Sequence, residues 1–258
     1  MIGIFDSGVG GLTVVKEIKK LLPDAPILYF GDTARLPYGN KSQETIQKYS
    51  AEIVDFLKKK GCKAIVIACN TASALAADHL REKYPELEIY DVVSMGAEAA
   101  FETTKNKKVG VIGTTATINN GVYNKKISEI DPNIKVFTKA CPLFVPLVEE
   151  SWINRPETKK IARVYLKKLK LEKIDTLLLG CTHYPLLEKV VYGVMGKRTQ
   201  VIASGEKLAQ KLEKKNWRNQ ENQGDKGDKY FVSDLTEHFE KLASKILGKS
   251  IRIEKTEI

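Results

Sequence analysis

Short apolar runs alternate with amphipathic segments in the N-terminal part of the chain. The runs have the length and composition of buried strands, and they lie at residues 2–5, 27–30, 64–68 and 88–93. Helical periodicity lies between them, at residues 11–22, 42–61 and 71–84. Ser42 is placed to cap the second of these helices, and Gly61 is placed to end it. This order predicts parallel strands connected by helices.

The same alternation resumes at Lys108 and continues to residue 203, which predicts a second α/β unit. Residues 216–229 then break the pattern, because they are polar and have no apolar period. We interpret them as a mobile surface loop. A strand at residues 230–233 and a helix at residues 235–247 follow.

We expect this tail to pack against the first unit, which would make the first domain discontinuous. The predicted domains are then residues 1–96 plus 206–258, and residues 97–205.

Three segments of the first unit have counterparts in the second at nearly equal spacing. Ile2-Gly-Ile-Phe-Asp6-Ser7-Gly8 resembles Val109-Gly-Val-Ile-Gly113-Thr114-Thr115, Asp32–Pro37 loosely resembles Cys141–Pro146, and Cys69 corresponds to Cys181. Each pairing is weak by itself, because short apolar strands resemble one another. Together they predict an α/β fold of two similar parallel-sheet domains related by pseudo-twofold symmetry, with an active site in the cleft between them.

Both of these corresponding cysteines end an apolar run and are followed at once by hydrogen-bonding residues. The segments are Ala64-Ile-Val-Ile-Ala-Cys69-Asn70-Thr71 and Thr176-Leu-Leu-Leu-Gly-Cys181-Thr182-His183. Open α/β sheets bind ligands at the carboxyl ends of their strands. Two thiols in matching positions therefore suggest a pair that works on opposite sides of one substrate atom. The residues after each cysteine either cap a helix or bind substrate carboxylates.

Two further loops follow predicted strands. In Asp6-Ser-Gly-Val-Gly-Gly11 a dinucleotide fingerprint would need glycine where Thr13 stands, and no P-loop lysine follows. The turn can still offer backbone N–H groups to a carboxylate, while Asp6 either binds an ammonium group, assists proton transfer or caps the helix. In the loop of residues 32–39, Tyr38 and Gly39 either present a ring and an amide to a ligand or form an ordinary turn.

The amino-acid composition limits which binding partners and which cellular compartment we expect for the protein. The chain has 42 Lys and Arg against 32 Asp and Glu, a net charge of +10. The lysines are spread along helices without interleaved aromatic residues, so we expect a solvated basic surface and no nucleic-acid partner. No apolar stretch reaches the ~20 residues that cross a bilayer, and no signal peptide is visible. We therefore expect a cytoplasmic protein with no membrane partner and with its four cysteines as thiols.

The other candidate side chains have less informative contexts. Cys62 and Cys141 are expected to be packing residues, the second because it lacks the strand-then-helix setting. With no C-x-x-C spacing among the cysteines, no metal site is expected. His79 and His238 lie in charged helices and are expected at the surface. Glu149 either directs a carboxylate towards the cleft or begins a solvated helix.

Six segments, in order, resemble those of the glutamate racemases within the aspartate/glutamate racemase superfamily. They are IGIFDSGVGGLTVVKEI, DTARLPYGNKS, ACNTASA, GVIGTTATI, ACPLFVPLVEE and LGCTHYPLL. The family consists of cofactor-independent isomerases that supply D-glutamate for peptidoglycan. The resemblance therefore implies glutamate as the substrate, no cofactor and a homodimer.

The resemblance also implies roles for particular residues. Cys69 and Cys181 would be the acid/base pair, Cys69 acting on D-glutamate and Cys181 on L-glutamate, with help from Asp6, Glu149 and His183. Substrate contacts would come from Asp6, Ser7, Tyr38, Gly39, Asn70, Thr71, Thr115, Thr182 and His183. Two departures concern local packing: Val93-Ser94-Met95-Gly96 replaces an expected Pro-Gly turn, and Ala203 stands where an Asp is usual.

The residues alone are compatible with three other functions. An aspartate racemase would use the same two thiols. A cysteine hydrolase or amidase, with Cys69 or Cys181 as nucleophile and His183 as base, would leave one thiol without a role. A non-catalytic two-domain protein that binds small acids would be typical of exported receptors, which carry a signal peptide.

Overall fold

A computed structural model describes residues 1–215, 217 and 227–258 of the chain. The chain divides into two compact units, Met1–Val92 with Gly205–Ile258, and Val93–Ser204. Residues 93–96, which the sequence analysis placed in the first domain, lie in the second unit, and Gly205, which it placed in the second domain, lies in the first. Residues 93–96 lie in a helix whose Val93, Ala97 and Ala100 pack into the core of the second unit.

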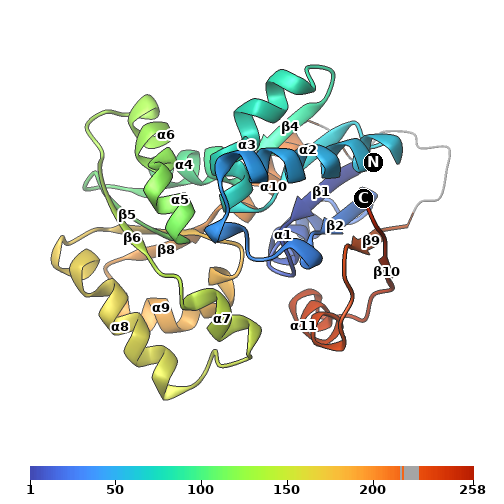
Figure 1. Cartoon of the computed structure of the whole chain (residues 1–258). Coiled ribbons are helices and arrows are strands. Elements are labelled where there is room, and N and C mark those ends of the chain that lie inside the picture. The colour runs from blue at the N-terminus through green and yellow to red at the C-terminus, as the bar shows by residue number, and fades with distance from the viewer. Residues whose placement is uncertain (216, 218–226) are drawn as a thin grey trace. The chain divides into compact units, whose positions relative to one another are not determined.

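The described residues of the first unit form one parallel six-stranded sheet with helices and two short 3-10 helices around it (Figure 1). The strands are β1 (Ile2–Asp6), β2 (Ile27–Gly31), β3 (Ala64–Ile67), β4 (Glu88–Asp91), β9 (Lys229–Val232) and β10 (Ile253–Lys255), in the order β10-β9-β2-β1-β3-β4. The helices are α1 (Leu12–Leu21), η1 (Thr33–Arg35), η2 (Tyr38–Asn40), α2 (Gln43–Lys59), α3 (Asn70–Lys83), α10 (Ser204–Lys214) and α11 (Glu237–Leu247).

Local signals define several boundaries of the first unit. The Ser42 side chain accepts the N–H of Thr45, which confirms it as the N-cap of α2, and Gly61 has a positive φ of 85° just after that helix. Alternate residues of the strands, such as Phe5 and Ile65, pack against Leu57 of α2 and neighbouring side chains. The strand predicted at residues 88–93 is too long, because β4 ends at Asp91 and a helix begins at once.

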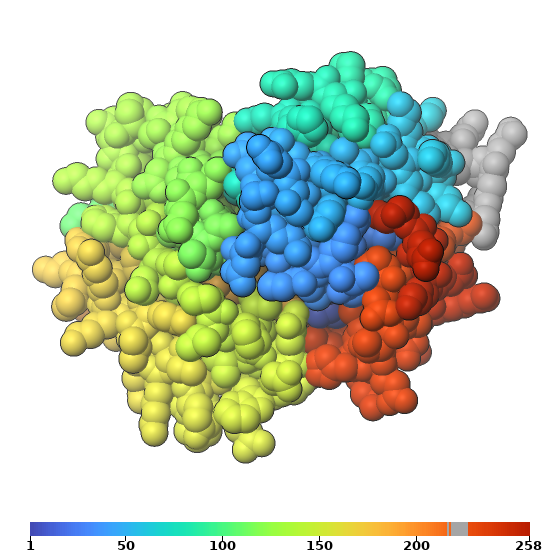
Figure 2. Space-filling model, in the orientation of Figure 1, coloured from blue at the N-terminus to red at the C-terminus, as the bar shows by residue number. Residues whose placement is uncertain are grey.

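The C-terminal residues complete the first sheet. Strand β9 pairs in parallel with β2, β10 pairs with β9, and α11 contacts α1. Figure 2 shows these C-terminal residues, in red, lying against N-terminal ones, in blue. The prediction of a mobile surface loop at residues 216–229 is wrong at two described positions, because Trp217 is buried and Lys229 begins β9. The remaining residues of this segment, apart from Gly227 and Asp228, lie outside the described part of the chain.

The described residues of the second unit form a parallel four-stranded sheet. Its strands are β5 (Lys108–Gly113), β6 (Lys135–Ala140), β7 (Thr176–Gly180) and β8 (Gln200–Ala203), in the order β6-β5-β7-β8. Its helices are α4 (Val92–Thr103), α5 (Thr115–Asn120), α6 (Val122–Ile130), α7 (Phe144–Glu149), α8 (Pro156–Leu171), η3 (Tyr184–Leu187) and α9 (Glu188–Met195). Val93–Gly96, where a turn was expected, is part of α4.

Helices cover both faces of this second sheet, because its strands alternate their side chains between two cores. Val111 and Leu178 pack with residues of α4 and α6 on one face. Ile112 and Leu179 pack with Phe144 and other residues of α7, α8 and α9 on the opposite face.

The two sheets share one topology. The order β2-β1-β3-β4 in the first unit corresponds strand by strand to β6-β5-β7-β8 in the second. The first of the three segment pairs noted in the sequence spans the ends of β1 and β5, and the other two follow β2 and β6, and β3 and β7. The predicted α/β class with two similar parallel sheets is confirmed. None of the described helices is long and apolar enough to cross a membrane.

Candidate functional site

The candidate residues of the first unit lie at the carboxyl ends of three adjacent strands. Asp6 ends β1, Asp32 follows β2, and Cys69 follows β3 after one intervening residue. Strands β2, β1 and β3 are neighbours in register, so these residues share one edge of the sheet. This is the edge at which open α/β sheets bind ligands.

Cys69 is the N-cap residue of α3. Its Sγ accepts the N–H of Ala72 at 3.5 Å, and the thiol donates to Ser7 Oγ at 3.7 Å. An N–H donor and the positive end of a helix dipole both favour a thiolate at this sulfur. Asn70 and Thr71 are therefore not caps: they are the first two residues of the helix, both buried beside the thiol.

Asp6 is fully buried and closes the glycine-rich turn that follows β1. Its Oδ2 accepts the N–H groups of Gly8 and Gly11, both at 3.0 Å. A Cβ at position 11 would lie 2.4 Å from Asp6 Cβ, so the turn requires glycine there. These two amides bind Asp6, and the expectation that the turn offers them to a substrate carboxylate is therefore wrong for Gly8 and Gly11.

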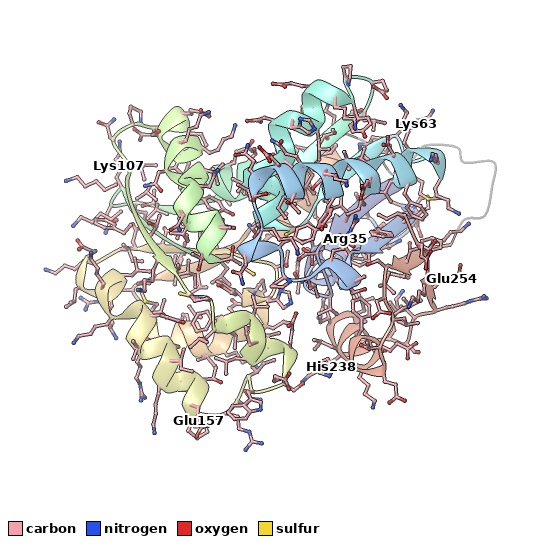
Figure 3. All side chains as sticks on the ribbon, in the orientation of Figure 1. Arg35, Lys63, Lys107, Glu157, His238 and Glu254 are labelled. Carbon is pink, nitrogen blue, oxygen red and sulfur yellow. The ribbon has the colours of Figure 1, made fainter. Side chains whose placement is uncertain are left out.

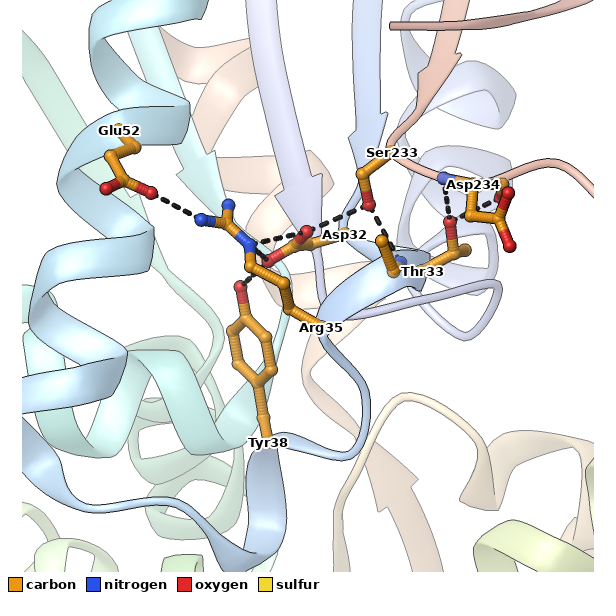
Figure 4. Close-up of polar contacts among 8 residues, drawn as sticks. Asp32, Thr33, Arg35, Tyr38, Glu52, Ser233 and Asp234 are labelled. Carbon is orange, nitrogen blue, oxygen red and sulfur yellow. Dashed lines mark hydrogen bonds and ion pairs between the residues drawn. The ribbon is translucent and has the colours of Figure 1, made fainter. Parts of the chain in front are cut away.

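The loop after β2 is organised around Asp32, which is fully buried (Figure 4). Arg35 Nε donates to both Asp32 carboxylate oxygens, at 2.9 and 2.7 Å, and the Tyr38 hydroxyl donates to Oδ2. Ser233 Oγ donates to Oδ1 at 2.9 Å, and Glu52 accepts from Arg35 Nη1. Asp32 thus connects the loop to β9, while Arg35 connects it to α2.

Tyr38, whose ring the sequence analysis allowed to face a ligand, is buried. The ring is buried in the same core cluster as Cys69. Burial and the Asp32 charge both raise the pKa of Tyr38, so the phenol remains protonated and donates to Asp32. Gly39, the next residue, is half-buried in η2.

The candidate residues of the second unit form a connected chain. Cys181 directly follows β7, and its Sγ lies 4.0 Å from His183 Nδ1. On the other side of the ring, His183 Nε2 lies 3.1 Å from Glu149 Oε1, at the last residue of α7. Glu149 therefore does not begin a solvated helix: it lies where a carboxylate can orient the imidazole.

The two thiols lie in different local structures. We expected Thr182 and His183 to begin an α-helix, as Asn70 and Thr71 do. Instead, both lie in a turn, a short 3-10 helix begins at Tyr184, and α9 begins only at Glu188. The neighbour of the second sulfur is an imidazole and not the N-terminus of an α-helix. Thr182 is buried, and Thr115, at the first position of α5, is exposed.

Cys62 and Cys141 are both buried, as expected of packing residues. Burial raises the pKa of Cys62 to about 11 and that of Cys141 to about 12, so both remain protonated thiols at neutral pH. The stated context of Cys141 was wrong, because it follows β6 directly and precedes α7. His238 is exposed on α11 (Figure 3) and His79 is half-buried on α3.

The sequence analysis assigned no role to Asp32, Arg35, Ser233 or Tyr29. Asp32 had a usable signal, since it follows a strand as Asp6 does. Ser233 had none, because its partner Asp32 lies 201 residues away. Among the described residues, no group of three His, Cys, Asp or Glu side chains could hold a metal ion.

Known proteins are similar to this chain in sequence and in fold. The Asp/Glu/Hydantoin racemase family matches residues 10–212. A glutamate racemase from Chlorobaculum tepidum is 46% identical over 97% of this chain and 93% of its own length.

Among the solved structures that resemble this one, the following two align over the whole chain. A glutamate racemase isoform from Bacillus anthracis aligns with a TM-score of 0.91 and 39% identity, over 100% of this chain and 97% of its own. The glutamate racemase of Francisella tularensis, in complex with D-glutamate, aligns over the same fractions with a TM-score of 0.91 and 35% identity. The resemblance seen in the six sequence segments is confirmed, and the chain belongs to the Asp/Glu/Hydantoin racemase family.

Proposed function

We propose that the protein is a glutamate racemase that interconverts L- and D-glutamate with Cys69 and Cys181 as its two bases. The observation that carries this proposal is the position of the thiols. Each follows the third strand of a sheet with the same strand order, and each has a neighbour that can activate it. The named relatives support glutamate as the substrate.

Racemisation removes the proton from Cα and returns one to the opposite face. Two groups that reach the two faces are the simplest solution, and one must be a thiolate while the other is a thiol. A free cysteine has a pKa near ~8.5 and is mostly protonated at neutral pH, so the abstracting thiol needs activation. The helix N-terminus at Cys69 and the imidazole at Cys181 are the groups that can supply it.

We assign abstraction from L-glutamate to Cys181. Its proton leaves to His183, whose imidazolium Glu149 stabilises, and the thiolate then removes the Cα proton. Cys69, as a thiol beside Ser7, delivers a proton to the other face. In the reverse direction Cys69 is the base, held as a thiolate by the Ala72 N–H and assisted by Asp6.

The carbanion formed between these steps needs hydrogen bonds and exclusion of water. For the substrate contacts we propose Asp6, Ser7, Tyr38, Gly39, Asn70, Thr71, Thr115, Thr182 and His183. Burial of Asn70, Thr71 and Thr182 beside the thiols supports this for three of them. The same resemblance supports a cytoplasmic homodimer that supplies D-glutamate for peptidoglycan.

Incubation of the purified protein with L-glutamate in D₂O, without added cofactor, tests the proposal. We expect D-glutamate that carries deuterium at Cα. Absence of both racemisation and exchange would show that the proposal is wrong. A parallel incubation with L-aspartate separates the two racemases, and we expect glutamate to be turned over faster.

One arrangement favours a second function. Cys181, His183 and Glu149 have the order of nucleophile, base and orienting carboxylate found in cysteine hydrolases. Such an enzyme would form an acyl-enzyme with an amide or ester substrate. Exchange at Cα of free glutamate, with no covalent adduct on Cys181 by mass spectrometry, would exclude it.

A further inference from the structure

Tyr29 is a buried phenol that the proposed reaction does not use. It lies in β2, is 1% exposed, and its hydroxyl donates to the carbonyl of Gly8 at 2.5 Å. A Cβ at Gly31 would lie 3.2 Å from the same carbonyl, which is therefore enclosed by β2 as well.

Gly8 lies in the glycine-rich turn that follows β1 and is held there by two hydrogen bonds. Its N–H donates to Asp6 Oδ2 and its carbonyl accepts from Tyr29, so both of its peptide groups are held. Glycine has the largest backbone freedom of any residue, and the hydrogen bonds to Asp6 and from Tyr29 restrict the backbone of Gly8. Loss of the tyrosine hydroxyl would leave a buried carbonyl without this donor.

The residue immediately before Gly8 is Ser7, whose hydroxyl contacts the Cys69 sulfur at 3.7 Å. The position of that hydroxyl therefore depends on how the turn is held. Burial, followed by the nearby charges of Asp6 and Cys69, raises the pKa of Tyr29, so its hydroxyl remains a donor at neutral pH.

We propose that Tyr29 is a positioning residue of the racemase: through the Gly8 carbonyl it holds Ser7 against Cys69. This inference rests on the proposed function and adds to it a residue that does not touch the substrate.

Tyr29→Phe removes the hydroxyl and keeps the ring. The matched control is Tyr230→Phe, because Tyr230 pairs with Tyr29 in the sheet, packs its ring at 6.3 Å between centroids and is also buried. No hydrogen bond joins its hydroxyl to the described residues of the turn. We expect Tyr29→Phe to lower kcat/KM about tenfold, and Tyr230→Phe to change it less than about twofold, in folded protein checked by thermal melting.

A double-mutant cycle tests whether Tyr29 acts through Ser7. In a Ser7→Ala background, Tyr29→Phe should lower kcat/KM by no more than about twofold further. A further tenfold loss in that background would overturn the proposal. So would a wild-type kcat/KM in Tyr29→Phe, or an equal loss in Tyr230→Phe, which would indicate a general effect of removing a buried hydroxyl from this sheet.

A second readout does not depend on racemisation. Once Cys69 is a thiolate its sulfur can only accept, and the Ser7 hydroxyl becomes the donor that stabilises it. Iodoacetamide labelling at neutral pH, resolved by mass spectrometry of the peptide that contains Cys69, should therefore be at least about threefold slower in Tyr29→Phe than in wild type. Tyr230→Phe should label at the wild-type rate. If wild type fails to racemise glutamate, the proposed function is wrong, and unchanged Cys69 labelling in Tyr29→Phe separately overturns the role of Tyr29.

Discussion

At the scale of single residues, the two candidate thiols differ in what surrounds them. Cys69 accepts a helix N–H, a group that keeps its proton, whereas Cys181 lies beside His183, an imidazole that can take up or release one. In the proposed mechanism, the two directions of the reaction would therefore depend on different groups. Cys62 and Cys141 differ from both, because burial raises their pKa values to about 11 and about 12.

We expect Cys69→Ala and Cys181→Ala each to abolish racemisation, because each thiol serves one face of Cα. Cys62→Ala and Cys141→Ala should keep the activity, since burial holds these thiols protonated. Coupled assays from both enantiomers measure this. An active Cys181→Ala enzyme would refute the two-base mechanism.

His183→Asn should lower kcat for L-glutamate more than for D-glutamate, because His183 contacts Cys181. Asp6→Asn should do the reverse, since Asp6 closes the turn that carries Ser7 to Cys69. The equilibrium constant between mirror images is one, so kcat/KM must fall equally in both directions and the asymmetry appears only in kcat and KM separately. Saturation curves for both enantiomers measure it. If both variants keep the wild-type kcat in both directions, His183 and Asp6 have only structural roles.

At the scale of elements, the connection after each thiol decides its neighbours. After β3 the chain enters α3 at once, with Cys69 as the cap. After β7 it passes through a turn and η3 before α9 begins. The same strand position in two similar sheets thus places one thiol at a helix N-terminus and the other beside an imidazole.

Cys69 should therefore contribute to stability as well as to catalysis. Cys69→Ser keeps an acceptor for the Ala72 N–H, and Cys69→Ala removes it. We expect both variants to be inactive, with the alanine variant about 1 kcal/mol less stable than the serine variant. Thermal melting compares them. Equal melting temperatures would show that the cap contributes nothing.

Asp175 joins the connection between α4 and β5 to the start of β7. It accepts from Thr104 Oγ1 and from the N–H groups of Lys105 and Asn106, each at 2.7 Å. Burial acts to raise the pKa of Asp175, but these hydrogen bonds outweigh it and the pKa is lowered.

A carboxyl group with a lowered pKa in the folded state stabilises the fold above its unfolded pKa, near ~3.9, and loses that contribution as the pH falls through the folded value. Asp175→Asn should destabilise the second unit by about 1–3 kcal/mol at pH 7, and the difference from wild type should shrink below about pH 4. Asp78→Asn, on an exposed carboxylate, is the control. Urea unfolding at pH 7 and below pH 4 measures the stability difference between the variant and wild type. A difference that does not change with pH would contradict the lowered pKa of Asp175.

At the scale of the whole molecule, the two units have the same order of four strands, and the first unit has additional strands at one edge of its sheet. The first sheet gains β9 and β10 from the C-terminal segment, and the second sheet has no counterpart of them among the described residues. This extension brings Ser233 to Asp32, and therefore reaches the loop that carries Tyr38.

Residues 218–226 should tolerate shortening, because their composition is polar and long polar loops cost little to trim. Trp217 and Asp228 should be kept, since Trp217 is buried and Asp228 pairs with Lys19 at 2.6 Å. We expect wild-type activity and melting temperature in a shortened chain. Lost activity with an unchanged melting temperature would place this segment in the site or its gating.

The sequence by itself determined the α/β class, the two similar parallel-sheet units and both thiols at strand ends. It also determined the Ser42 cap of α2. These features depend on neighbouring residues: apolar runs, helical periodicity and cap residues act over a few positions, so they are readable along the chain.

Only the tertiary structure decided which polar groups meet. Ser233 reaches Asp32, Tyr29 reaches Gly8, and His183 reaches Glu149, all from different elements. It also decided that Trp217 is buried and that no α-helix begins directly after Cys181. Such pairings depend on how separate elements pack, and a short polar segment has no periodicity that would specify its distant partner.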